Sequence, residues 1–342
     1  MKVKQLSGIL FLFSLLWLAS CKKDEQPAGA GHYTEGVFVV NEGPFGGTGT
    51  ITWHNPRTGE TVQDVFGLAN GGAVLGQFVQ SLTLHNGKAY VVVNGANKVY
   101  VVDAVTFVYL DTIGGLAQPR HLLPVRDQYA YLSQWGADGL SGSVVKIDLS
   151  TNKVVKTIPA GHGPEKLHLA LSGALWAPNS GGYGLDSTIT SISLATDAVN
   201  NTFSAGGKNP CCIQTGQGAE YALCKGDWLA PDDSGYLVEL GAGGTSAFPL
   251  PQGADDLSVS PDGQTFYFTS GGSIWSAGPS GPKKWLDQPA YGLGCDPLSG
   301  NLYCADAKDF NSVGEVVIYK PSGEKVGGFP VGIAPGEVVF IR

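Results

Sequence analysis

The sequence predicts an all-β protein that folds as a single seven-bladed β-propeller with four-stranded blades. A four-residue step, in which a proline or small apolar residue and two variable residues precede an aliphatic residue, occurs seven times. Its aliphatic residue recurs about every 43 residues from Leu82 to Val338, a period typical of propeller blades. The 50 glycines and 20 prolines among 342 residues favour short strands and turns over long helices.

Each step is predicted to open the first strand of a blade. The steps are Val79-Gln80-Ser81-Leu82, Pro119-Arg120-His121-Leu122, Pro164-Glu165-Lys166-Leu167, Pro210-Cys211-Cys212-Ile213, Ala254-Asp255-Asp256-Leu257, Ala290-Tyr291-Gly292-Leu293 and Pro335-Gly336-Glu337-Val338. Turns such as Asn86-Gly87 and Asp262-Gly263 then lead into a second, more apolar strand, because glycine adopts the positive φ that tight turns need. Residues 37–40 begin the first blade without a preceding strand. Residues 338–341 are predicted to supply that strand from the C-terminus and so to close the ring.

The N-terminus predicts export. Residues 1–20 combine Lys2 and Lys4 with a short apolar run, the layout of a signal peptide. The Leu-Ala-Ser-Cys sequence that ends at Cys21 resembles a bacterial lipobox, which implies lipidation of Cys21; an ordinary cleaved signal is the alternative. Residues 21–33 then form a flexible tether, and residues 34–342 form the propeller. The net charge of −8, without a basic cluster, excludes nucleic acid as a partner.

The repeat and its Ser-Pro-Asp-Gly turn resemble the YncE-like seven-bladed propellers over the whole mature chain. Residues 38–43, 75–81 and 86–94 are similar to a Bacteroidetes branch of surface lipoproteins. The Lys-Asp-Glu sequence after Cys21 resembles the surface-export signal of that group. The branch includes propellers that capture cobalamin beside a TonB-dependent transporter. The resemblance therefore implies an outer-membrane location, exposure at the cell surface, a corrinoid ligand and a transporter partner.

Motifs for hydrolytic, phosphate-binding or dinucleotide chemistry are absent from the sequence, and we expect no metal and no cofactor. We therefore place the functional site on the face where the steps and the loops after the second strands converge. Polar and aromatic residues there fit a large amphipathic ligand, because aromatic rings offer flat area and polar groups orient the ligand. The candidate ligand-binding residues are Gln80, Arg120, His121, Gln134, Trp135, Glu165, Lys166, Tyr183, Asp227, Trp228, Asp255, Asp256, Tyr291, Phe310 and Glu337. The alternative is that the aromatic residues cap blades and the polar ring is hydrated.

Five cysteines follow Cys21. If Gln217-Gly218 is a two-residue turn, Cys211 lies opposite Cys224, and an even separation also allows Cys295 to face Cys304. Two disulfides and a free Cys212 are the expectation. Reduced thiols and a bridge between Cys211 and Cys212 are the alternatives.

These features predict a non-enzymatic, lipid-anchored surface protein that binds a corrinoid or similar nutrient for a TonB-dependent transporter. Two other functions stay open at this point. An enzyme of the lactonase or quinoprotein type would need a metal or cofactor constellation at the mouth of the ring. A module for adhesion to protein or glycan would need only a flat acidic face.

Overall fold

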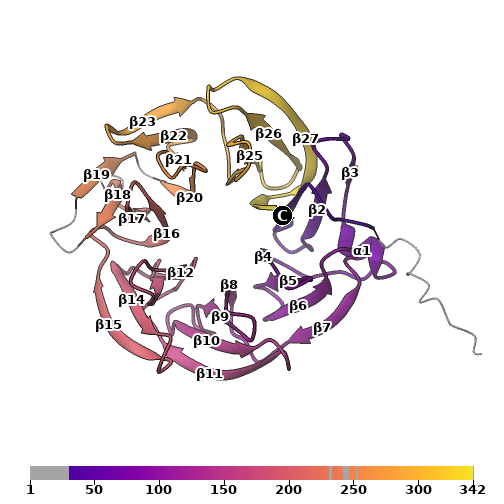
Figure 1. Cartoon of the computed structure of the whole chain (residues 1–342), viewed down its shortest axis with the longest axis horizontal. Helices are drawn as coiled ribbons and strands as arrows, with labels where there is room; N and C mark the ends of the chain where they lie inside the picture. The colour runs from indigo at the N-terminus through magenta and orange to yellow at the C-terminus, as the bar shows by residue number, and fades with distance from the viewer. Residues whose placement is uncertain (1–30, 231–232, 242–245, 252, 342) are drawn as a thin grey trace, which may run out of the picture.

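The computed structural model describes residues 31–230, 233–241, 246–251 and 253–341, and it confirms the seven-bladed propeller (Figure 1). Seven antiparallel sheets of four strands each surround a central axis. The predicted signal peptide, Cys21 and most of the predicted tether lie outside the described residues. Within the described part of the chain, no helix is long and apolar enough to cross a membrane.

Each blade runs outward from the axis through four strands. The innermost strands are β4 (Val79–His85), β8 (Pro119–Val125), β12 (His168–Leu169), β16 (Pro210–Gly216), β20 (Asp255–Val259), β24 (Gly292–Cys295) and β28 (Pro335–Phe340). The second strands are β1 (Val37–Asn41), β5 (Lys88–Val93), β9 (Tyr129–Gln134), β13 (Leu175–Pro178), β17 (Ala219–Cys224), β21 (Phe266–Ser270) and β25 (Leu302–Asp306). The third strands are β2 (Thr50–His54), β6 (Lys98–Asp103), β10 (Ser143–Asp148), β14 (Thr188–Ser193), β18 (Gly235–Leu240), β22 (Ser273–Gly278) and β26 (Val313–Tyr319). The outer strands are β3 (Thr61–Val62), β7 (Tyr109–Ile113), β11 (Lys153–Pro159), β15 (Ala198–Ser204), β19 (Ser246–Leu250), β23 (Gly281–Leu286) and β27 (Lys325–Ile333).

The ring closes as the sequence predicts. The C-terminal strand β28 pairs with β1 in an antiparallel register that sets Val338 opposite Val39, and the C-terminus lies near the axis beside the first blade (Figure 1). Closure leaves β1 flanked on both sides, and all five of its residues are buried. A short helix, α1 (Val65–Ala69), which the sequence did not predict, follows β3 and is capped by Asp64.

Most of the steps share a local geometry that turns their side chains toward the axis. The strand register shifts at the step in β4, β8, β16, β20 and β28, which marks a β-bulge in each. A bulge bends the strand and redirects its side chains. In six blades the residue just before the step has a positive φ; these residues are Phe78, Gln118, Gly163, Asn209, Gly253 and Ala334. The chain thus makes the same sharp entry into the inner strand around most of the ring.

The bulge in β16 also overturns the disulfide expected between Cys211 and Cys224. Gln217 and Gly218 do form the two-residue turn, with φ of 52° and 80°. However, Cys224 lies opposite Pro210, and Leu223 lies opposite Cys212, so Cys211 is the extra residue of the bulge. All three cysteines are free thiols.

The second expected disulfide is wrong as well. Cys295 lies opposite Leu302, whereas Cys304 lies opposite Leu293. The two cysteines are therefore diagonal neighbours, and the Cα atoms of such pairs are about 7–8 Å apart, beyond the usual reach of a disulfide. Both are free in the structure.

Candidate functional site

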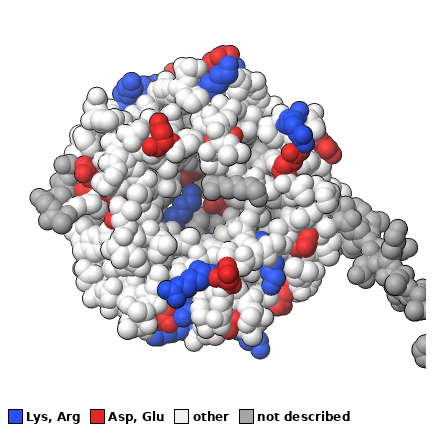
Figure 2. Space-filling view, viewed as in Figure 1, with Lys and Arg blue, Asp and Glu red and all other residues white. Residues whose placement is uncertain are grey.

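A cavity of about 110 Å³ lies on the propeller axis, and its lining includes the second residue of all seven steps. We call it the axial cavity. Basic and acidic side chains are visible together inside the central opening of the ring, whereas most of the surrounding face carries neither (Figure 2). The lining residues are Glu42, Gln80, Arg120, His121, Glu165, Lys166, Cys211, Cys212, Lys225, Asp255, Asp256, Tyr291, Gly336 and Glu337.

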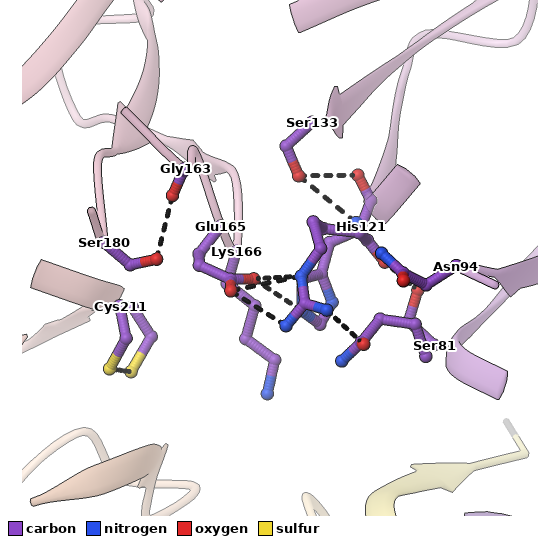
Figure 3. Close-up of polar contacts among 12 residues, drawn as sticks. Ser81, Asn94, His121, Ser133, Gly163, Glu165, Lys166, Ser180 and Cys211 are labelled. Atoms are coloured by element: carbon purple, nitrogen blue, oxygen red, sulfur yellow. Dashed lines mark hydrogen bonds and ion pairs between the residues drawn. The ribbon is translucent and has the colours of Figure 1, made fainter. Parts of the chain in front are cut away.

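Arg120 and Glu165 form an ion pair in the wall of the axial cavity, and they join the third and fourth blades. The Arg120 Nη2 atom donates to Glu165 Oε1 over 2.9 Å, and Nε donates to both carboxylate oxygens over 3.1 Å (Figure 3). Arg120 also donates to the Gln80 side-chain oxygen, and His121 Nε2 lies 3.5 Å from Glu165 Oε2. Burial opposes ionisation of Glu165, but the charges of Arg120 and His121 outweigh it and lower the pKa of Glu165 to about 2. Glu165 is thus a carboxylate at neutral pH.

Two lysines complete the basic part of the wall. Lys166 Nζ lies 3.0 Å from Asp256, and Lys225 Nζ lies 2.7 Å from Asp255. Burial alone would lower the pKa of each lysine, but the facing aspartates outweigh burial and raise the pKa of both. Asp256 also accepts hydrogen bonds from the backbone N–H groups of Leu257 and Leu293, which fixes its position.

Two further carboxylates of the wall, those of Glu42 and Glu337, are held by hydrogen bonds. Glu42 accepts a hydrogen bond from the Tyr291 hydroxyl over 3.0 Å, and Glu337 accepts one from the Leu82 N–H over 2.8 Å. Neither carboxylate forms an ion pair with any described residue. Burial raises the pKa of Glu42. With five carboxylates and three permanent cations in its lining, the axial cavity favours neutral or cationic groups over anions.

A second cavity of about 430 Å³ adjoins the axial cavity, with which it shares Arg120, Glu165, Lys225 and Asp255. We call it the rim cavity. Trp135 and Trp228 line it. The Arg120 guanidinium lies 4.2 Å from the centre of the Trp135 ring, and the Nε1–H of Trp135 is buried without a hydrogen-bond partner among the described residues. Trp228 is 75% exposed, and an exposed indole beside a polar cavity offers flat area for a ligand.

The structure brings most of the predicted site residues together. Nine of them line the axial cavity and two more line the rim cavity. Tyr183, which is 70% exposed, packs edge-on against Trp135 at 5.8 Å, and Phe310 packs in the same way against Tyr291 at 5.0 Å. Neither ring lines a cavity itself.

Two of the predicted site residues form hydrogen bonds within the fold and do not line either cavity. Gln134 is buried, and its amide accepts from the Ala117 N–H and donates to Ser143 Oγ. Asp227 accepts from the Leu229 N–H and lies 4.0 Å from Lys208 Nζ, so it organises its own loop. Both residues lie outside the two cavity linings.

Five residues that line the axial cavity are not among the candidate ligand-binding residues: Glu42, Cys211, Cys212, Lys225 and Gly336. Glu42 and Lys225 come from loops after second strands, and the pattern of the steps does not select them. Cys211 and Cys212 occupy the two variable positions of the fourth step, so the repeat itself could have identified them. Among the described residues, no group of three or more His, Cys, Asp or Glu is arranged to hold a metal ion.

Comparison with known proteins supports the fold. A family model described as a domain of unknown function, DUF5074, matches residues 35–158. A quinoprotein alcohol dehydrogenase-like protein from Bacteroides thetaiotaomicron is similar at 17% identity and a TM-score of 0.70, over 91% of this chain and 79% of that one. The periplasmic gluconolactonase of Pseudomonas aeruginosa is similar at 13% identity and a TM-score of 0.64, over 90% and 99% of the two chains. A functionally unknown protein from Desulfotomaculum acetoxidans is similar at 14% identity and a TM-score of 0.66, over 90% of this chain and 99% of that one. No curated protein matches the sequence. The chain therefore shares the β-propeller fold of these proteins.

Proposed function

We propose that this protein binds a small amphipathic molecule in the two joined cavities without transforming it chemically. The observation that carries the proposal is the rim cavity, where an exposed indole, Trp228, stands beside the buried polar wall of Arg120, Glu165 and Lys225. Its volume of about 430 Å³ falls within the range of ligand pockets, about 300–1,000 Å³.

The polar wall is held in place before any ligand arrives. Arg120 is fixed by Gln80, by Glu165 and by the Trp135 ring, which come from three different blades. Side chains that are already ordered lose little entropy on binding, so contacts with them convert into affinity efficiently. A rigid ring of this kind suits capture of a ligand that arrives at low concentration.

A corrinoid is the ligand that we propose to test first, on the resemblance to cobalamin-capturing propellers. A corrin ring is too large to enter the rim cavity, so it would lie across the face with one edge inserted. Trp135, Trp228 and Tyr183 supply apolar area, while Arg120, Gln80 and Glu165 can meet the amide side chains. We further propose that the protein acts at the cell surface and delivers its ligand to a TonB-dependent transporter.

Alanine at Trp228 should weaken cyanocobalamin binding more than tenfold in isothermal titration calorimetry. Truncation of an aromatic anchor typically costs about 2 kcal/mol or more, and Trp228 is exposed enough that its loss should leave folding intact. Trp135→Ala should have a similar effect. Tyr109→Ala is the matched control, because Tyr109 is an exposed aromatic residue on the outer strand β7.

The same titration separates the proposals. Absence of heat with cyanocobalamin, hydroxocobalamin and cobinamide at micromolar protein would remove corrinoids as ligands. Assays with sugar lactones and with a quinone cofactor address the lactonase and quinoprotein alternative, and retention on immobilised glycans addresses adhesion. A corrinoid that binds equally well to wild type and to both tryptophan variants would place its site elsewhere.

Replacing Cys21 by Ser should release the protein from the membrane fraction, because the acyl chains are the proposed anchor. The measurement is fractionation of cells together with labelling by a radioactive or clickable palmitate. Wild type should carry the label and the variant should not. A variant that stays in membranes, with an unlabelled wild type, would contradict lipidation.

A further inference from the structure

Two adjacent cysteines, Cys211 and Cys212, lie in the wall of the axial cavity with their Sγ atoms 3.2 Å apart (Figure 3). Adjacent residues of a regular strand point to opposite faces. The β-bulge between Pro210 and Cys212 breaks this alternation, so both side chains line the same cavity. The proposed binding function does not use this pair.

We propose that Cys211 and Cys212 form a redox-active vicinal dithiol that a peroxide converts reversibly into a disulfide. In the first step, the sulfur of Cys212 attacks one oxygen of hydrogen peroxide. The O–O bond breaks, the Cys212 thiol becomes a sulfenic acid, and water leaves. The Cys211 sulfur then attacks the sulfenic sulfur, the S–O bond breaks, and the departing hydroxide takes the Cys211 proton and leaves as the second water. The two thiols are thereby oxidised by two electrons, and the peroxide is reduced to two waters.

The surroundings of the pair assign these roles. A hydrogen bond with Cys212, together with burial, raises the pKa of Cys211, so Cys211 stays protonated and acts second. Lys166 lines the same cavity as Cys212 and brings a positive charge to the wall where the first step takes place. Both thiols are nearly inaccessible except through the cavity, with exposures of 6% and 2%, so a small oxidant is required.

Adjacency also makes the bond reversible. The Cα atoms of neighbouring residues are about 3.8 Å apart, less than the roughly 4.4–6.8 Å that ordinary disulfides span. A bond that deviates from this geometry is more easily reduced, as is typical of labile disulfides. The proposal concerns the chain's own thiols and holds whatever ligand the cavities take.

Peptide mapping of the full chain tests the proposal. The native protein is treated with hydrogen peroxide, quenched with catalase, denatured in iodoacetamide, and cleaved after lysine and glutamate. Cleavage at Lys208, Glu220 and Lys225 separates fragment 209–220, which holds the pair, from fragment 221–225, which holds Cys224. We expect fragment 209–220 to be unalkylated and lighter by two hydrogen atoms, and to become doubly alkylated after dithiothreitol. Cys224 should be alkylated throughout.

Other outcomes overturn the proposal. Fragment 209–220 that stays doubly alkylated after peroxide shows two unreactive thiols, and fragment 209–220 linked to 221–225 shows a bridge to Cys224. In Cys211→Ser we expect Cys212 to be trapped by dimedone as a sulfenic acid, with no loss of two hydrogens. Cys295→Ser, which alters a partly exposed cysteine outside the cavity, should leave the oxidation of 209–220 unchanged. The mapping of wild type decides the question even if a variant fails to fold.

Discussion

Replacing Arg120 by Met should lower the free energy of unfolding by about 3–5 kcal/mol, because it removes one partner of a buried ion pair. The Glu165 side chain is only 8% exposed and receives three hydrogen bonds from Arg120. Without Arg120 its carboxylate stays buried and loses its three hydrogen bonds from the guanidinium, so burial then disfavours the charge. Denaturant unfolding followed by tryptophan fluorescence measures the loss.

A double variant separates two contributions to this destabilisation: the loss of the ion pair itself and the cost of leaving the Glu165 charge buried without its partner. Arg120→Met combined with Glu165→Gln should recover most of the lost stability, because a neutral amide is left in place of a buried charge. Lys284→Ala is the control, since it breaks an exposed pair with Asp287 and should cost less than about 1 kcal/mol. An Arg120→Met protein within 1 kcal/mol of wild type would show that the Arg120 pair contributes little to the ring.

The effect of Arg120→Met should depend on pH. Because the folded-state pKa of Glu165, about 2, lies below its ordinary value of 4.5, the carboxylate stabilises wild type above about pH 4.5. That contribution is lost as the pH falls from 4.5 through 2. In the variant, burial is no longer outweighed by Arg120, so protonation of Glu165 relieves the buried charge. The difference between the two proteins should therefore be largest near neutral pH and shrink in acid; a constant difference would implicate lost packing instead.

The fold was predictable because the four-residue step fixes both the blade period and the start of each inner strand. Closure was predictable because the first blade lacks its inner strand and the C-terminus offers one with matching aliphatic residues. The step also identified most of the axial cavity, since its variable positions are the ones that the bulges turn toward the axis. These are properties that a local pattern determines.

The wrong predictions about the cysteines and about Gln134 concern strand register and side-chain packing, which the repeated four-residue step does not specify. The bulge in β16 shifts the register by one residue, which moves Cys211 away from Cys224 and places it beside Cys212. Gln134 was assigned to the ligand face, but its amide satisfies polar groups within its own blade. Glu42 lies on a loop of the same face as the steps, but its hydrogen bond with the Tyr291 hydroxyl joins the first and last blades, which no local pattern specifies.

Deleting residues 335–342 should abolish cooperative folding, the largest effect that we expect from any change described here. The deletion removes β28 and leaves β1, a strand buried along its whole length, as an open edge. Exposed edges with unpaired backbone groups promote aggregation. It also removes Glu337, which accepts a hydrogen bond from the Leu82 N–H of the second blade, and Val338, which packs with Val37 and Val39. Circular dichroism during heating should show no cooperative transition, and most of the protein should be insoluble.

A circular permutant is the matched control for this deletion. Moving residues 335–342 in front of residue 31 through a short glycine–serine linker keeps every strand, because the end of β28, Phe340, pairs with the start of β1, Val37. In the permutant the first blade is continuous, and the ring closes by packing between the first and last blades instead of by an exchanged strand. We expect the permutant to be soluble and to unfold cooperatively at a lower midpoint than wild type. A truncated chain that melts cooperatively at the wild-type midpoint would contradict the closing role of β28, and a permutant as insoluble as the truncated chain would show that the covalent order of the strands, more than their pairing, holds the ring together.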